Sequence, residues 1–106
     1  MSHNQFQFIG NLTRDVDLRQ SENGGKSFAL IDIATNRAWY GSDEKLQKET
    51  DYFRLKVFGS AADRAAQYLK KGSQAFFQGR IKPTKYEKDG KTEYGTDFIV
   101  EIARYL

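Results

Sequence analysis

Aromatic and basic residues alternate along one short stretch of the chain, from Tyr52 to Phe58. Successive side chains of a β-strand point to opposite faces, so Phe53, Leu55 and Val57 share an apolar face that predicts a core row. The opposite face carries Tyr52, Arg54, Lys56 and Phe58. Aromatic rings can stack on bases and cations can neutralise phosphates, which would suit a single-stranded nucleic acid. Taken alone, this stretch is better explained as an ordinary strand whose long amphipathic side chains lie along its surface.

Further aromatic and basic residues extend the pattern beyond this stretch. The candidate stacking residues are Trp39, Tyr52, Phe58 and Tyr86. The candidate phosphate-binding residues are Arg37, Arg54, Lys56, Lys71, Lys82 and Lys85. Each aromatic residue alone is more simply explained as structural. Together, four aromatic residues on expected exposed faces, each within two positions of a cation, favour nucleic-acid binding.

The sequence contains no recognisable set of catalytic residues. The acidic residues fall in expected turns or loops beside basic ones, which is typical of solvated charge. His3 is the only histidine and there is no cysteine. No nucleophile motif or phosphate-binding glycine loop is present, and residues 21–25 predict a turn instead. We therefore expect no enzymatic activity, no cofactor and no metal site.

Strands are expected to carry most of these side chains. Strands are expected at residues 5–12 with an extended continuation at 16–20, and at 28–35, 52–59, 74–82 and 97–104. A helix is expected after Ser60, which would cap it in a capping box with Asp63, and it is expected to stop at Gly72. Residues 37–49 are polar and predict a long loop, and Asp89-Gly90 predicts a type I′ hairpin turn. Five strands with one helix between the third and fourth predict a mostly β OB-fold, a five-stranded Greek-key barrel, as one domain over residues 1–106.

Several motifs, in order along nearly the whole chain, resemble the bacterial single-stranded DNA-binding protein (SSB) family. They are Gly10-Asn11-Leu12 with Arg14-Asp15, Ala34-Thr35-Asn36-Arg37-Ala38-Trp39, Val57-Phe58-Gly59, Tyr68-Leu69-Lys70-Lys71-Gly72-Ser73-Gln74, Gly79-Arg80 and Lys85-Tyr86. The resemblance implies an OB-fold that wraps single-stranded DNA, with stacking aromatics at the four positions given above. Well-known members have tryptophan where this chain has Tyr52 and Tyr86, so weaker binding per site is expected.

The resemblance also implies a biological role and an assembly. It implies sequence-independent binding and protection of single-stranded DNA, with RNA as a possible ligand, in replication, recombination or repair. It implies a homo-oligomer, with a tetramer favoured over a dimer, although Gln5, Gln7 and Phe53 depart from the family at positions that bear on assembly. The alternative is a primosome-type OB-fold accessory protein that acts mainly through protein contacts.

The remaining expectations concern location and partners. A net charge of +3 and a pI near 9.2 permit a polyanionic partner without requiring one. No apolar run could span a membrane and the N-terminus is polar, so a cytoplasmic, nucleoid-associated protein without membrane contact is expected. The family's acidic C-terminal tail is missing, because the sequence ends at Tyr105-Leu106. We therefore expect no recruitment of proteins through such a tail.

Overall fold

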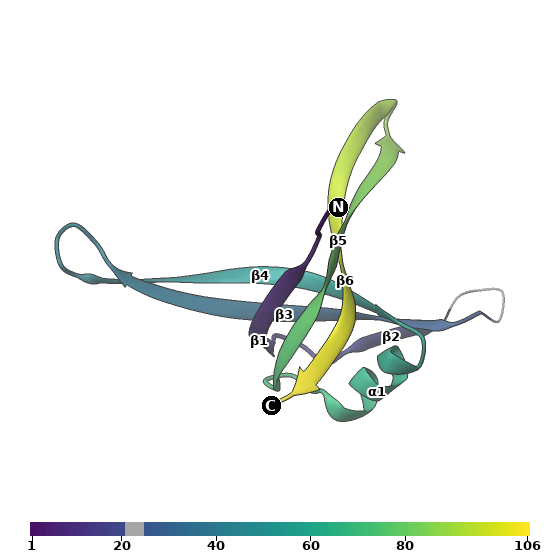
Figure 1. Cartoon of the computed structure of the whole chain (residues 1–106), viewed down its shortest axis with the longest axis horizontal. Coiled ribbons are helices and arrows are strands. Elements are labelled where there is room, and N and C mark those ends of the chain that lie inside the picture. The colour runs from purple at the N-terminus through teal and green to yellow at the C-terminus, as the bar shows by residue number, and fades with distance from the viewer. Residues whose placement is uncertain (21–24) are drawn as a thin grey trace.

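The computed structural model describes residues 1–20 and 25–106, and strands dominate it (Figure 1). In chain order the elements are β1 (Phe6–Leu12), β2 (Asp17–Gln20), β3 (Ser27–Tyr40), β4 (Leu46–Phe58), α1 (Ser60–Tyr68), β5 (Gln74–Lys88) and β6 (Lys91–Tyr105). The turn expected at residues 21–25 lies outside the described residues except for Gly25. Among the described residues there is no helical segment with the length and hydrophobicity of a membrane span.

The sheet closes on itself into a five-stranded barrel. Its strand order is β1-β5-β6-β4-β3-β2, and a further pairing of β1 with β3 closes the ring. All neighbours are antiparallel except β4 and β6, which run parallel where Leu55 lies beside Phe98. The short β2 pairs with the same edge of β3 as β1 does, further towards the start of β3. In the sequence, α1 lies between β4 and β5. This arrangement confirms the predicted OB-fold; the helix follows the third strand of the barrel, which is numbered β4 because β2 is counted separately.

Alternate residues of the strands fill the barrel. The largest fully buried side chains are Phe77, Ile31, Ile33, Leu55 and Leu69. Ala62 and Ala65 give α1 a face of small buried residues that packs against this core. Phe8 stacks on Phe53 with ring centroids 4.3 Å apart, and both rings pack against the core. The strand that carries the candidate stacking row is therefore fixed from its inner side by Phe53, Leu55 and Val57, as the alternation predicts.

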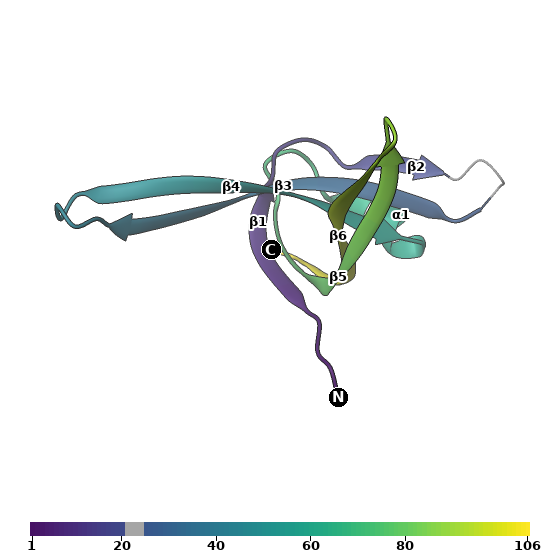
Figure 2. The same cartoon turned by 90° about the horizontal axis from the view of Figure 1, so that it is seen from above.

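Two hairpins extend beyond the barrel as two-stranded ribbons (Figures 1 and 2). β3 and β4 pair without interruption from Phe28 opposite Phe58 to Tyr40 opposite Leu46. The loop expected at residues 37–49 is therefore wrong: only residues 41–45 form the turn. Both faces of this ribbon meet solvent, so the polar residues there carry no apolar alternation. Cross-strand polar pairs hold it instead, such as the 2.7 Å hydrogen bond that the Thr50 hydroxyl donates to the Asn36 side chain.

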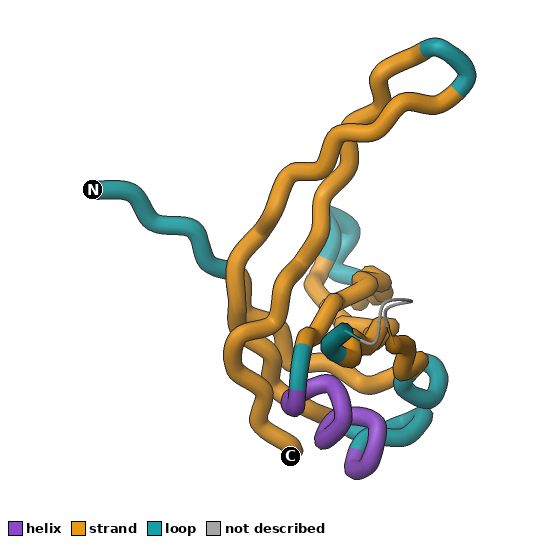
Figure 3. The backbone as a smooth tube through the Cα atoms, turned by 90° about the vertical axis from the view of Figure 1, so that its right-hand side faces the viewer, coloured by secondary structure: helices purple, strands orange, loops and turns teal. Residues whose placement is uncertain are grey.

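The second ribbon is formed by β5 and β6 and extends away from α1 (Figure 3). It turns at Asp89 and Gly90, whose φ angles are 52° and 76°. Positive φ at both central residues is what a type I′ turn requires, as the sequence predicts. A bulge between Gln78 and Gly79 shifts the pairing with β6 by one residue.

The ends of the helix differ from expectation. Ser60 is the first helical residue rather than the cap, because Gly59 precedes the helix with φ 73° and no side chain caps it. Asp63 does lie in the first turn. The helix ends at Tyr68, before Lys70 and Lys71, because Leu69 is extended and is buried in the core. Gly72 has φ 90° and lies in the turn that leads to β5, where its N–H donates to the Leu12 carbonyl oxygen at 2.8 Å.

Candidate nucleic-acid interface

The alternating row on β4 lies on the outer face of the barrel. Tyr52 is 72% exposed and Phe58 is 51% exposed, while Leu55 between them is fully buried. The cations Arg54 and Lys56 lie between the two rings on the same face. The structure thus presents two aromatic rings and two cations along about 20 Å of one strand, estimated from the usual rise per residue.

The neighbouring strands continue this outer face, because residues directly opposite one another in a sheet share a face. On β3, Phe28 lies opposite Phe58, with ring centroids 6.3 Å apart. On the other side, Lys56 lies beside Ile99 of β6, which in turn lies opposite Arg80 of β5. From Arg80 the same face continues outward along β5 through Lys82 to Tyr86. We refer to Tyr52, Arg54, Lys56, Phe58, Arg80, Lys82 and Tyr86 as the stacking face.

Trp39 and Arg37 do not belong to the stacking face. They lie opposite Gln47 and Glu49, on the face of the β3–β4 ribbon that continues the inner side of the barrel. The Arg37 guanidinium lies 4.9 Å from the centroid of the Trp39 ring, in a cation–π contact, and donates a 2.5 Å hydrogen bond to Glu49. Trp39 remains 41% exposed. The predicted stacking residues are therefore divided between two faces. The sequence predicts a loop around Trp39, and a loop does not assign a residue to either face.

The two remaining candidate cations also lie off the stacking face. Lys85 neighbours Tyr86 in sequence and so points to the other face of the β5–β6 ribbon. Lys71 lies in the turn after α1, where its backbone N–H donates to the Asp15 side chain at 2.9 Å. The structure therefore brings together Arg54, Lys56 and Lys82, and separates Lys71 and Lys85 from them.

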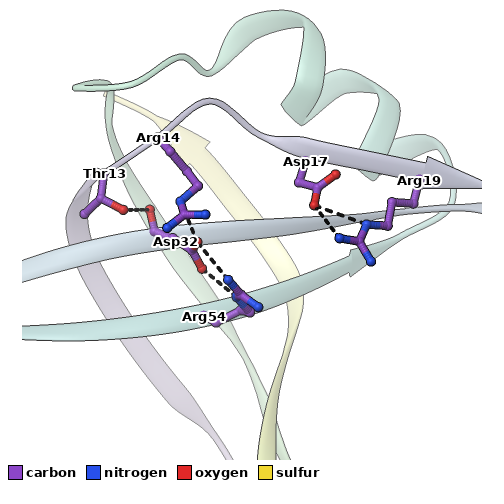
Figure 4. Close-up of polar contacts among 6 residues, drawn as sticks. All are labelled: Thr13, Arg14, Asp17, Arg19, Asp32 and Arg54. Carbon is purple, nitrogen blue, oxygen red and sulfur yellow. Dashed lines mark hydrogen bonds and ion pairs between the residues drawn. The ribbon is translucent and has the colours of Figure 1, made fainter.

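Acidic side chains pair with the cations of β4. Lys56 Nζ lies 3.0 Å from Asp97 Oδ2. Arg54 donates two hydrogen bonds to Asp32, from Nε at 2.8 Å and from Nη2 at 3.2 Å, and Arg14 Nε lies 3.0 Å from the same carboxylate (Figure 4). The Arg54 hydrogen bond holds the pKa of Asp32 below its usual value, and the pKa of Arg54 is raised by the same bond. Both groups are therefore charged at neutral pH.

The sequence interpretation did not include two cations that the structure places at this face. Arg80 has the outward parity of its strand and lies across Ile99 of β6 from Lys56, two residues before Lys82 on β5, and that parity is visible in the alternation of β5. Arg14 reaches the face from the turn after β1 through Asp32. No local sequence signal could have placed Arg14 there, because the contact depends on how the chain folds back.

Acidic side chains do not gather into a metal site in the part of the chain that the structure describes. No group of three or more His, Cys, Asp or Glu residues there could hold a metal ion. The acids at the stacking face are each paired with cations. What the face offers is exposed rings, guanidinium and ammonium groups, and fixed strand positions, which is the chemistry of binding a flexible polyanion with unpaired bases.

Comparison with known proteins agrees with this geometry. The family model described as the single-strand binding protein family matches residues 3–106. The SSB of Plasmodium falciparum, solved in complex with ssDNA, superposes with a TM-score of 0.88 at 26% identity, covering 100% of this chain and 96% of that one. A deletion mutant of the single-stranded DNA binding protein from Thermus aquaticus superposes with a TM-score of 0.87 at 27% identity, covering 98% of this chain and 50% of that one. The chain therefore belongs to the single-strand binding protein family.

Proposed function

We propose that this protein binds single-stranded DNA independently of sequence and protects it during replication, recombination or repair, without catalysis and in the cytoplasm. Bases stack on Tyr52, Phe58 and Tyr86 and, on the second face of the ribbon, on Trp39. The stacking-face cations and Arg37, Lys71 and Lys85 contact phosphates. A DNA strand that contacts both the stacking face and Trp39 must pass around the β3–β4 ribbon, because Tyr52 and Trp39 lie on opposite faces of that ribbon.

The observation that carries this proposal is the row of β4, in which two exposed rings bracket two cations on an outer barrel face. Family membership supports it, as does the related Plasmodium falciparum SSB that was solved with ssDNA. Stacking on aromatic rings tolerates every base, since each base has a π-face, so no sequence preference is expected.

A titration with labelled oligonucleotides of increasing length tests the proposal. Oligo(dT) and a mixed single strand should bind alike, the duplex of the same sequence should bind far more weakly, and the number of nucleotides per protein should reach a plateau as the oligonucleotide lengthens. An equal preference for the duplex would contradict the proposal. A matched oligo(rU) series measures the preference for DNA over RNA. A short fixed site that does not depend on length would favour the primosome-type accessory protein.

Trp39 provides an internal reporter because it is the only tryptophan. If a base stacks on its exposed face, oligo(dT) should quench its fluorescence. Replacing Trp39 by alanine should then weaken binding by about 1–3 kcal/mol. Trp39→Phe should restore most of the affinity, since a ring remains. Unchanged emission at saturating DNA would show that Trp39 does not contact the bases.

The cations should make binding strongly dependent on salt. Each phosphate contact released by salt contributes about −0.7 to the log–log slope for single strands. Lys82 has no ion-pair partner among the described residues, so Lys82→Ala should flatten the slope by nearly one such increment. Arg64→Ala, which removes the same charge from an exposed residue of α1, serves as the control. Equal slopes for the wild type and the Lys82 variant would place Lys82 outside the DNA path.

The outer face of β1, β5 and β6 supports the proposal of a homo-oligomer, with a tetramer favoured. Ile9 is 56% exposed and lies opposite Phe76, which is half-buried, and Ile102 is 37% exposed nearby. Gln7 donates a 3.2 Å hydrogen bond to Gln78 beside them. Exposed apolar side chains gathered on one face of a small domain are typical of a self-association surface.

Light scattering tests this assembly. At micromolar concentration we expect a mass near four chains of 12.2 kDa, which falls towards two chains on dilution. Ile9→Lys should shift the mass downward, because a buried charge without a partner disfavours the contact. A wild-type protein that is monomeric at all concentrations tested would contradict the proposal.

A further inference from the structure

Asp32 lies beneath two arginine side chains at the stacking face. Its side chain is 16% exposed, whereas the side chains of Arg54 and Arg14 are 58% and 66% exposed. The carboxylate accepts from Arg54 at 2.8 and 3.2 Å and pairs with Arg14 at 3.0 Å (Figure 4). One acid thus holds two guanidinium groups from different segments of the chain.

Backbone structure fixes all three residues in this arrangement. Asp32 on β3 lies directly opposite Arg54 on β4, so the two side chains share a face. Arg14 follows Thr13, whose N–H donates to the Asp32 carbonyl oxygen at 2.9 Å and whose hydroxyl donates to the same oxygen at 3.4 Å. The turn after β1 is therefore attached to β3 at the residue whose carboxylate it contacts.

Asp32, Arg14 and Arg54, which we refer to as the triad, border a hollow of about 330 Å³ beside the proposed stacking ring of Tyr52. Thr13, Arg14, Asp32, Tyr52 and Arg54 line it together with the barrel residues Ile33 and Phe53. A nucleotide stacked on Tyr52 would bring its phosphate to these guanidinium groups. The Asp32 contacts leave most of their N–H groups free to donate outward, since each guanidinium carries five.

The carboxylate and a DNA phosphate would compete for the same two cations. In the free protein the triad has two positive charges and one negative charge, and the lowered pKa of Asp32 keeps the negative charge present at neutral pH. A phosphate that binds both guanidinium groups must come close to this carboxylate, and like charges at short range repel. Asp97, 3.0 Å from Lys56, places a second acid on the same face.

We propose that Asp32 is an affinity-determining residue that competes with DNA phosphate for Arg14 and Arg54. As a result, the protein binds single strands more weakly and releases them more readily than it would with an uncharged side chain at position 32. The inference rests on the proposed binding of single-stranded DNA. It assigns to an acid on a basic surface the role of limiting affinity, whereas a purely structural role would leave binding unchanged or lower it on removal.

Asp32→Asn tests the inference, because it keeps the shape of the side chain and removes its charge. The variant should bind oligo(dT) several-fold more tightly at low salt, and its log–log salt slope should steepen by about 0.7, the value of one additional phosphate contact to a single strand. Asp63→Asn is the matched control. It changes the net charge equally but lies exposed in the first turn of α1, so it should leave affinity and slope near the wild-type values.

Arg14→Gln, measured in both backgrounds, tests the competition itself. It should weaken binding less in the wild type, where Asp32 already occupies Arg14, than in the Asp32→Asn background, where Arg14 is free for phosphate. This unequal cost is a coupling that independent sites would not show. Thermal melting confirms that each variant is folded. If the asparagine variant melts early, Asp32→Thr repeats the test with a side chain that favours strands.

The outcomes separate the two proposals. Tighter binding and a steeper slope in a folded Asp32 variant support the inference. If the wild type binds oligo(dT) and the folded Asp32 variants bind equally or more weakly, the inference is overturned. Asp32 then has the structural role of holding Arg14 and Arg54 in position. Absence of oligo(dT) binding by the wild type overturns the proposed function itself.

Discussion

Replacing Tyr52 and Phe58 together by alanine should weaken binding to oligo(dT) by about 2–6 kcal/mol. Each base–aromatic stack contributes about 1–3 kcal/mol by alanine substitution. The two rings lie at opposite ends of the β4 row, about 20 Å apart by the usual rise of a strand, so their contributions should add. Both side chains are more than half exposed, and the strand is held from its other face by Phe53, Leu55 and Val57. Binding should therefore fall without loss of the fold, as fluorescence anisotropy and a thermal melt can show.

Tyr68 and Tyr105 provide the matched control for this experiment. They are 60% and 43% exposed, and their ring centroids are 6.0 Å apart, so replacing both by alanine also removes two exposed rings. Neither belongs to the stacking face. The control variant should keep its affinity within about threefold, a difference below 1 kcal/mol. An equal loss of affinity in both double variants would mean that the rings of β4 have no special role.

Replacing Gly79 by alanine should lower the free energy of unfolding by about 3 kcal/mol, the upper end of the usual cost of overpacking. A Cβ at this position would lie 1.8 Å from the Ile99 carbonyl oxygen and 2.9 Å from Cε2 of Phe6. The nearest atom belongs to the backbone of β6, so the clash cannot be relieved by a side-chain rotation. Strand β5 would have to separate from β6 at the bulge, which is where the outer face of the barrel begins to lead into the second ribbon.

Urea denaturation measures this loss, with Gly41→Ala as the control. At Gly41 the nearest atom to an added Cβ is a side-chain oxygen of Asp43 at 3.1 Å, and the residue lies at the turn of the first ribbon. That variant should change stability by less than about 1 kcal/mol, as surface substitutions usually do. A Gly79→Ala protein as stable as the wild type would show that the two strands do not approach so closely at the bulge.

The sequence predicts the barrel well because its inner faces are apolar. Rows such as Phe53, Leu55 and Val57 alternate with exposed residues, and the type I′ signal at Asp89-Gly90 is a local requirement for positive φ. The loop predicted at residues 37–49 is wrong for the converse reason. A two-stranded ribbon with solvent on both faces needs no apolar row, so its pairing follows from the barrel strands that it extends.

The candidate site was predictable as far as one strand determines it. The parity of β4 places Tyr52 and Phe58 on one exposed face, as the structure has them. The face of Trp39 cannot be predicted from a segment whose pattern indicates a loop. The ion pairs could not be predicted either, because Arg14 meets Asp32 and Lys56 meets Asp97 only after distant segments have come together.

Photocrosslinking of oligo(dT) to the protein, with the attached peptides mapped by mass spectrometry, shows directly which aromatic residues the bases contact. If single-stranded DNA stacks on the aromatic residues of this face, crosslinks should form at Tyr52, Phe58 and Tyr86, and at Trp39 on the second face of the ribbon. The α1 and C-terminal residues Tyr68 and Tyr105 should remain unmodified. Crosslinks confined to Tyr68 and Tyr105, or none at Tyr52 and Phe58 under saturating oligo(dT), would show that single-stranded DNA does not stack on the β4 row.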